Sequence, residues 1–351
     1  MSVKKILPWL LPTWDALLAS PQHLPHALLL AGPGGLGKSA FAEALASRLL
    51  CEDPAGSYAC GRCEACHWFA LGNHPDFRKL TFEREDEEGV GDESDRSGTA
   101  KAARKTPSTQ IRIDQVRALE DFVFVGSHRN GSRVIIIDPA DAMNMAAVNA
   151  LLKILEEPPP SVYFLIVSSK WRALLPTLLS RCRKVLFDRP DPHIAENWLR
   201  EQGVKLAAQE LALVGGLPLR ALSAETTGTP DSTTKFLAPL TKIPIDALSV
   251  AAQWSTQLGA EKTSGLEALV DAVQKWVCDL NRCRHGVMPR YLTDHANSLG
   301  KTAARANPAR LMRCHEDLLK IRATCRHPLN TQLFLEEIAY RLAAATAPIQ
   351  A

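Results

Sequence analysis

The sequence predicts an α/β domain with a doubly wound parallel sheet, followed by helical domains. Three unbroken apolar runs, residues 26–31, 133–138 and 162–167, indicate strands buried on both faces of a parallel sheet. Apolar residues at helical spacing follow in 39–50, and a second helix is expected over 142–155, where a run of prolines ends it. This alternation of strand and helix is typical of doubly wound α/β folds.

Length and composition are those of a soluble protein of two or three domains. The chain has 351 residues, of which 46% are apolar and 23% charged. No apolar run approaches the roughly 18 residues of a membrane-spanning helix. Residues 1–18 carry two lysines before an apolar stretch, but Pro8, Pro12, Trp14 and Asp15 interrupt it, and no small-residue cleavage site follows. We therefore expect a cytoplasmic protein without membrane contact.

The net charge of +3 is too small to mark a dedicated nucleic-acid binder. Such proteins usually concentrate Lys and Arg on one face. Any contact with DNA is therefore expected to be local or shared with other chains.

Residues 32–39 read GPGGLGKS, the form G-x-x-x-x-G-K-[ST] of a phosphate-binding loop. The loop joins a predicted strand to a predicted helix, so its backbone N–H groups can surround phosphates at a helix N-terminus. Lys38 is expected to reach the terminal phosphates and Ser39 to ligate Mg²⁺. The alternative is a preserved loop that no longer binds. ATP with Mg²⁺ is the candidate ligand, and its expected binding residues are Gly32, Gly34, Gly35, Gly37, Lys38, Ser39 and Asp138.

The catalytic acid of a nucleotide hydrolase is missing from its usual position. Asp138 ends an apolar strand where a metal-side aspartate is expected, but Pro139 follows it in place of a carboxylate. Asp141 can conceivably reach round, although the sequence favours it as the N-cap of the next helix. We therefore expect little or no ATP hydrolysis by this chain alone, because positioning errors of ~1 Å already cost about 10²-fold in rate.

Four of the nine cysteines form the pattern C-x8-C-x2-C-x2-C. Four thiolates at this spacing can surround one tetrahedral ion, and they leave no open position for catalysis. Structural zinc is the prediction, and a redox dithiol is the alternative. His67 adjoins the cluster and is a possible substitute ligand. The predicted ligands are Cys51, Cys60, Cys63 and Cys66, and the buried-thiol prediction covers Cys182, Cys278, Cys283, Cys314 and Cys325.

Residues 83–109 are almost free of large apolar side chains, with an acidic half followed by a basic half. Such a segment cannot bury enough apolar surface to offset its ordering entropy. The composition predicts a disordered surface insertion. A segment that binds a partner is the alternative.

These motifs together resemble the clamp-loader branch of the AAA+ ATPases, in the form found in bacterial DNA polymerase III. The resemblance covers most of residues 1–182, and NALLKILEEPP paired with SRC is its most specific part. HPLNTQLFLEEIAYRL near the C-terminus looks like the last helix of the family's collar domain. The other matching stretches are LPWLLPTWDALL, HALLLAGPGGLGKS, the cysteine module, IRIDQVRAL and RVIIIDPAD.

The resemblance implies three domains and a ring of subunits. It implies an AAA+ P-loop domain over 1–188 with a zinc module at 51–66, a helical lid over 189–228 and a helical collar over 235–348. The implied partners are gamma/tau and delta subunits in a five-member ring, and the sliding clamp and primed DNA through that assembly.

The resemblance also implies roles for three further positions. Arg181, in the SRC motif, would act in trans as an arginine finger on nucleotide held by a neighbouring subunit; the alternative is a surface salt bridge or a helix C-terminal cation. Arg220 would be a lid arginine directed at the chain's own nucleotide, or else an ordinary surface residue. Ser168 and Ser169 would sense phosphate, or else bond to backbone. Two features depart from the members of the family that this chain resembles. Their phosphate loop is often degraded, whereas this one is intact and leaves nucleotide binding open, and the long 83–109 insertion is extra.

Three functions are compatible with these residues. The first is a subunit that hydrolyses no ATP itself but completes a neighbour's active site with Arg181. The second is an ATP-hydrolysing motor subunit of the same loader, which the intact loop favours and Pro139 opposes. The third is an unrelated P-loop phosphotransferase, which leaves the SRC and NALLKILEEPP motifs unexplained.

Overall fold

The computed structural model describes residues 5–20, 23–82, 110–124, 131–226, 230–241, 244–258, 262–325 and 330–347. The chain divides into two compact units, Met1–Arg189 and Pro190–Ala351. Each unit has its own hydrophobic core and is described by itself. The predicted insertion at 83–109 lies outside the described residues.

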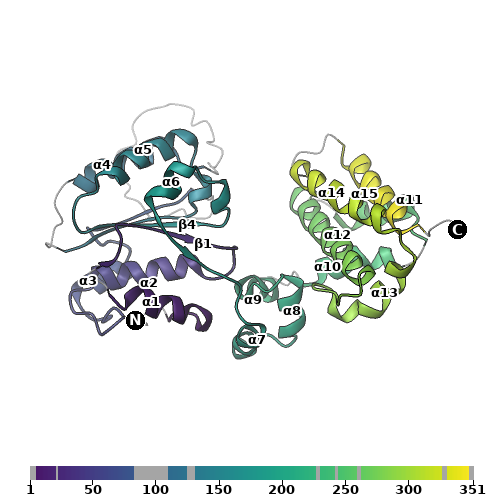
Figure 1. The fold of residues 1–351 in the computed structure, drawn as a ribbon, viewed down its shortest axis with the longest axis horizontal. Helices are drawn as coiled ribbons and strands as arrows, with labels where there is room; N and C mark the ends of the chain where they lie inside the picture. Colours follow the sequence, from purple (N-terminus) through teal and green to yellow (C-terminus); the bar gives the residue numbers. More distant parts are fainter. Residues whose placement is uncertain are drawn as a thin grey trace, which may run out of the picture. The chain divides into compact units, whose positions relative to one another are not determined.

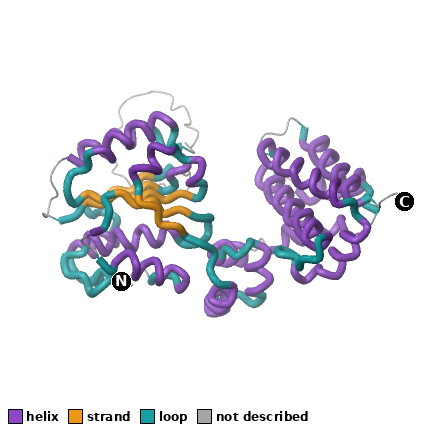
Figure 2. Tube along the Cα trace, in the orientation of Figure 1, coloured by secondary structure: helices purple, strands orange, loops and turns teal. Residues whose placement is uncertain are grey.

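The first unit is built on a five-stranded parallel sheet of order β2-β3-β4-β1-β5. Every residue of β1 is buried, since β4 and β5 flank it and helices cover both sheet faces (Figure 2). The fold class predicted from the apolar runs is confirmed. The strands are β1 (Ala27–Ala31), β2 (Phe77–Leu80), β3 (Arg133–Ile137), β4 (Val162–Ser168) and β5 (Arg183–Leu186).

Helices form a layer on each face of the sheet. Figure 1 shows α1, α2 and α3 on one face and α4, α5 and α6 on the other. A buried apolar cluster fills the space between the sheet and the second layer, with Leu29, Ile135 and Phe164 from the strands and Leu151 from α5. The helices are α1 (Leu11–Leu18), α2 (Lys38–Leu50), α3 (Glu64–Ala70), α4 (Ile113–Phe124), α5 (Met145–Glu156) and α6 (Pro176–Arg181).

In the described residues the second unit is helical, as the sequence predicts. It contains a small buried cluster that includes Leu199 and Leu211, and a larger one that includes Trp254 and Leu318. The predicted division of this unit into a lid and a collar stays a prediction. Its helices are α7 (Pro192–Glu201), α8 (Ala207–Leu213), α9 (Pro218–Thr226), α10 (Pro230–Leu237), α11 (Ala247–Leu258), α12 (Lys262–Arg284), α13 (Ala296–Arg305), α14 (Pro308–Thr324) and α15 (Thr331–Thr346).

A search of the described residues for a membrane-spanning helix finds none of sufficient length and apolar character.

A buried carboxylate fixes the connection between α12 and α13. Asp279, on α12, is fully buried. Its two oxygens accept hydrogen bonds from the backbone N–H groups of Arg290 (2.7 Å), Tyr291 (2.9 Å) and Leu292 (2.8 Å). Three donors satisfy the buried charge, so the loop can leave α12 without exposing its backbone to an apolar core.

We expect Asp279→Ala to lower the free energy of unfolding by about 3 kcal/mol or more, because it leaves three buried N–H groups without an acceptor. Urea denaturation followed by circular dichroism measures the loss. Asp294→Ala, at an exposed aspartate of the same connection, is the matched control. Equal stability of the two variants would contradict the role given to Asp279.

Candidate functional site

The phosphate loop leaves β1 at the carboxyl edge of the sheet and ends at the N-terminus of α2. Gly37, the residue before α2, has φ 93° and ψ 20°, a left-handed conformation that favours glycine. Gly32 is required for a different reason: a Cβ there would lie 2.4 Å from the Phe187 carbonyl oxygen. Gly34 and Gly35 are half-buried between them, and Ser39 is exposed in the first turn of α2. The backbone therefore has the shape expected of a phosphate cradle.

Lys38 is folded onto its own loop. Its side chain is buried, and Nζ donates to the Pro33 carbonyl oxygen (2.7 Å) and to the Ser169 hydroxyl (3.3 Å). Ser169 directly follows β4, the strand beside β1. The ammonium is thus held at the carboxyl edge of the sheet, where a bound anion would need it.

Asp138 lies at the same edge, one residue beyond β3, and is half-buried. A cis peptide bond joins it to Pro139. Within the described part of the chain its carboxylate accepts no hydrogen bond, and its role toward a metal ion stays a prediction. The residue after it carries no acid, as the sequence states.

The expectation that Asp141 caps the next helix is wrong. Its carboxylate accepts hydrogen bonds from the Ser168 hydroxyl and from the backbone N–H groups of Ser169 (3.0 Å) and Lys170 (3.1 Å). The cap is Asn144, whose side chain accepts from the Ala147 N–H at 2.8 Å. The chain makes a short 3₁₀ turn over Ala140–Ala142 first, so α5 begins at Met145 rather than at residue 142. The carboxylate of Asp141 is therefore hydrogen-bonded to the end of β4.

Arg181 is the last residue of α6 and is one-third exposed. Its guanidinium donates to Glu156 Oε1 at 2.6 Å and to the Thr177 carbonyl oxygen at 3.1 Å. Glu156 ends α5 and belongs to the LEEPP stretch, so the contact joins the two most specific motifs of the sequence. Sequence reasoning named Arg181 but missed Glu156, because 25 residues separate the partners and no local pattern links them.

Arg220 lies on α9 in the second unit, where it is exposed. Its backbone N–H donates to the Leu217 carbonyl oxygen at 3.0 Å, as in the first turn of a helix. A role toward nucleotide stays a prediction.

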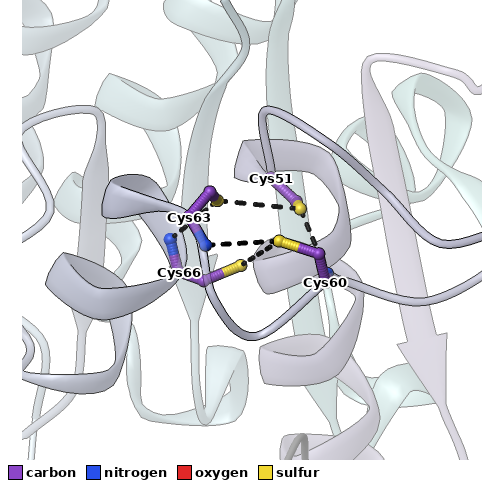
Figure 3. Close-up of side chains that lie close together, drawn as sticks. All are labelled: Cys51, Cys60, Cys63 and Cys66. Carbon is purple, nitrogen blue, oxygen red and sulfur yellow. Dashed lines mark hydrogen bonds between the residues drawn. The ribbon is translucent and has the colours of Figure 1, made fainter.

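The four clustered cysteines come together from three short segments (Figure 3). Cys51 follows α2, Cys63 is the residue before α3, Cys66 lies in the first turn of α3, and Cys60 lies in the connecting segment. All four sulfurs lie within 4.8 Å of one another, and the Cys51–Cys63 and Cys60–Cys66 sulfur pairs are each 3.9 Å apart. A disulfide would need about 2.05 Å. A tetrahedral ion with bonds of about 2.3 Å to sulfur places its ligands about 3.8 Å apart, so the cluster can hold a metal ion.

Backbone N–H groups support the charge on these sulfurs. Cys60 N–H donates to Cys51 Sγ (3.2 Å), Cys63 N–H to Cys60 Sγ (3.4 Å) and Cys66 N–H to Cys63 Sγ (3.4 Å). Hydrogen bonds from the Arg62 and Cys63 backbone lower the pKa of the Cys60 thiol to about 6. Burial raises the pKa values of Cys51 and Cys66 instead.

The remaining cysteine predictions hold only in part. His67 is exposed and does not belong to the cluster. Of the five scattered cysteines, Cys182, Cys314 and Cys325 are buried, whereas Cys278 and Cys283 are half-buried.

Comparison with known proteins identifies the family of the chain. The family model described as "DNA polymerase III, delta subunit" matches residues 15–191, and the model described as "DNA polymerase III, delta subunit, C terminal" matches residues 236–343. The DNA polymerase III subunit delta' of Pseudomonas aeruginosa is 32% identical over 98% of this chain and 99% of its own length. The same subunit of Escherichia coli K12 is 28% identical over 97% of this chain and 98% of its own.

Among solved structures, a DNA polymerase III gamma subunit-related protein from Thermotoga maritima is 15% identical, with a TM-score of 0.41 over 96% of this chain and 99% of that one. This structural similarity is too weak to assign a family. The family models and the near full-length sequence identity assign one: the chain belongs to the delta' family of DNA polymerase III clamp-loader subunits.

Proposed function

We propose that this chain is a non-motor subunit of the clamp loader, which holds nucleotide without hydrolysing it and supplies Arg181 to the active site of a neighbouring ATPase subunit. The observation that carries the proposal is the absence of a carboxylate after Asp138. Pro139 has no acid, and the carboxylate of Asp141 is bonded to the end of β4. A loop with Lys38 and Asp138 in place can bind a phosphate chain, but nothing beside Asp138 would activate the attacking water.

The proposed partners are gamma/tau and delta subunits in a five-member ring, with the sliding clamp and primed DNA reached through that assembly. The sequence similarity to delta' subunits supports this assembly. Arg181 suits a role in trans because its guanidinium is a fixed planar cation at the partly exposed end of a helix. Glu156 and the Thr177 carbonyl oxygen occupy only two of its N–H directions, so other donors can face a γ-phosphate.

The second candidate is a motor subunit of the same loader. The intact loop favours it, with a buried Lys38 and glycines at the two positions that require them. The two candidates differ in a single observable, which is conversion of bound ATP by the chain alone.

We also propose that the metal of the cysteine cluster is structural zinc. Four thiolates in a closed tetrahedron suit zinc and leave no coordination position for substrate. Binding would contribute about 10–16 kcal/mol to the folding of residues 51–66.

In a single-turnover assay with labelled ATP and Mg²⁺, we expect the purified chain to retain nucleotide but not to convert it. Lys38→Ala should abolish retention, since it removes the cation that reaches the terminal phosphates. Pro139→Glu should introduce conversion if the missing acid is the only defect. Conversion by the unmodified chain that disappears in Lys38→Ala would identify a motor subunit and refute the non-motor proposal.

Arg181→Ala should leave folding and assembly unchanged but lower ATP turnover at the neighbouring site by about 10³ or more. Steady-state turnover of the reconstituted loader, with clamp and primed DNA, measures this effect. Arg183→Ala, at an exposed arginine two residues away, is the matched control. If the loader with Arg181→Ala hydrolyses ATP as fast as the loader with this control, Arg181 does not act as an arginine finger.

The chain should bind one zinc ion that survives dialysis and is released when a mercurial titrates four thiols. Atomic absorption gives the metal content, and a chromophoric chelator follows the release. Replacing Cys60 and Cys63 by serine should abolish metal binding, whereas Cys283→Ser, outside the cluster, should preserve it. A fully folded, metal-free preparation of the unmodified chain would reject the zinc assignment.

A further inference from the structure

The second unit contains a pocket of about 510 Å³ beside α13, which we call the α13 pocket. It lies between α10, the following 3₁₀ turn Ala238–Thr241, α12 and α13. We propose that the α13 pocket docks an acidic peptide segment that carries a large apolar side chain. Its apolar floor consists of Leu237, Leu240, Trp276, Leu292 and Leu299, and its polar rim includes His295 and the cations Lys301 and Arg305.

Within the part of the chain that the structure describes, Lys301 and Arg305 on the rim have no acidic partner. Lys301 and Arg305 are exposed and stand one helical turn apart on α13. In the described residues neither side chain forms an ion pair or hydrogen bond, and the pocket lining includes no acidic residue. The sequence of α13, ANSLGKTAAR, also lacks an acid. Two like charges at this spacing repel each other, so a ligand with a carboxylate between them would reduce this repulsion.

The hydroxyl groups of the rim are already used as donors. Ser298 Oγ donates to the His295 carbonyl oxygen at 2.9 Å, and Thr302 Oγ donates to the Ser298 carbonyl oxygen at 3.0 Å. Recognition of an anion therefore falls to the rim cations. Arg305 can bind a carboxylate with two parallel hydrogen bonds.

The floor is suited to an apolar side chain. Leu240, Leu292 and Leu299 are buried members of the large hydrophobic cluster of the second unit, so a side chain that enters the pocket continues this cluster. The backbone at Leu292 in this floor is held in place before any ligand binds, because the Leu292 N–H is one of the three groups that donate to buried Asp279. A preformed floor lowers the entropic cost of ordering on binding.

The same features argue against a nucleic acid. Trp276 is only 7% exposed and offers no open ring face on which a base can stack. The two rim cations, Lys301 and Arg305, come from one helix and are too few to follow a phosphate backbone. The combination of a buried apolar floor and a short cationic edge fits carboxylates around one apolar residue.

The test measures binding of a fluorescein-labelled peptide, EELFEE, to the full chain by fluorescence anisotropy. The peptides KKLFKK and EEGGEE remove the charge and the apolar side chains in turn, and both should bind weakly or not at all. Replacing Lys301 and Arg305 by glutamate should weaken EELFEE binding by about tenfold or more, since like charges then face each other. The matched control replaces Arg310 and Arg313, exposed on α14 outside the pocket lining, by glutamate and should bind normally.

A second variant tests the floor without touching the charges. Thr241→Trp places an indole at the exposed edge of the pocket and should block EELFEE while Lys301 and Arg305 stay in place. Thermal melts identify any variant that fails to fold. If a variant fails, the readout becomes the chemical-shift change of the Leu240 and Leu299 methyl groups when EELFEE is added to the unmodified chain.

Three results would each overturn the proposal. The first is no EELFEE binding at millimolar concentration. The second is binding that the charge reversal at Lys301 and Arg305 leaves unchanged. The third is a single-stranded oligonucleotide that binds more tightly than EELFEE and loses its affinity in the same variant, which would identify a nucleic-acid site.

Discussion

The burial of β1 between β4 and β5 in a parallel sheet is the constraint on which the candidate site depends. Parallel strands all end at one edge, so the residues that follow β1, β3 and β4 meet there without any interaction of their own. Gly32, Asp138 and Ser169 each come within one residue of a strand end. The close approach of Gly32 to the Phe187 carbonyl oxygen adds β5 to this convergence. Formation of the buried sheet thus brings the residues around the phosphate loop together, and the loop itself needs only a conformation that is compatible with them.

The parts of the fold that follow from one-dimensional patterns could be predicted from the sequence. Unbroken apolar runs give the buried strands, and cysteine spacing gives the cluster of four sulfurs, because both depend on near neighbours in the chain. Asp141 could not be placed in this way. A carboxylate before a helix is a good cap locally, but the end of β4 offers three donors that become neighbours only after the sheet forms. The Arg181–Glu156 ion pair and the α13 pocket escaped prediction for the same reason, since both join segments that lie far apart in the chain.

The structure uses two different solutions for burying charge. At Asp279 a single carboxylate is surrounded by backbone donors, which hold a loop in place without a second charge. At the cysteine cluster the sulfurs share backbone donors with one another, and the remaining negative charge is of the kind that a divalent ion neutralises. The first arrangement is complete within the chain. The second can be completed by an ion.

The contacts of Lys38 connect the loop to the neighbouring strand. Its ammonium bonds to the Ser169 hydroxyl, and the adjacent backbone N–H of Ser169 bonds to Asp141. A phosphate that draws the ammonium out of the loop must break the bond to Ser169 and replace it. Occupancy of the loop by a phosphate would therefore be coupled to the end of β4 through one residue, and a geometry that strengthens the Ser169–Lys38 bond would oppose that occupancy.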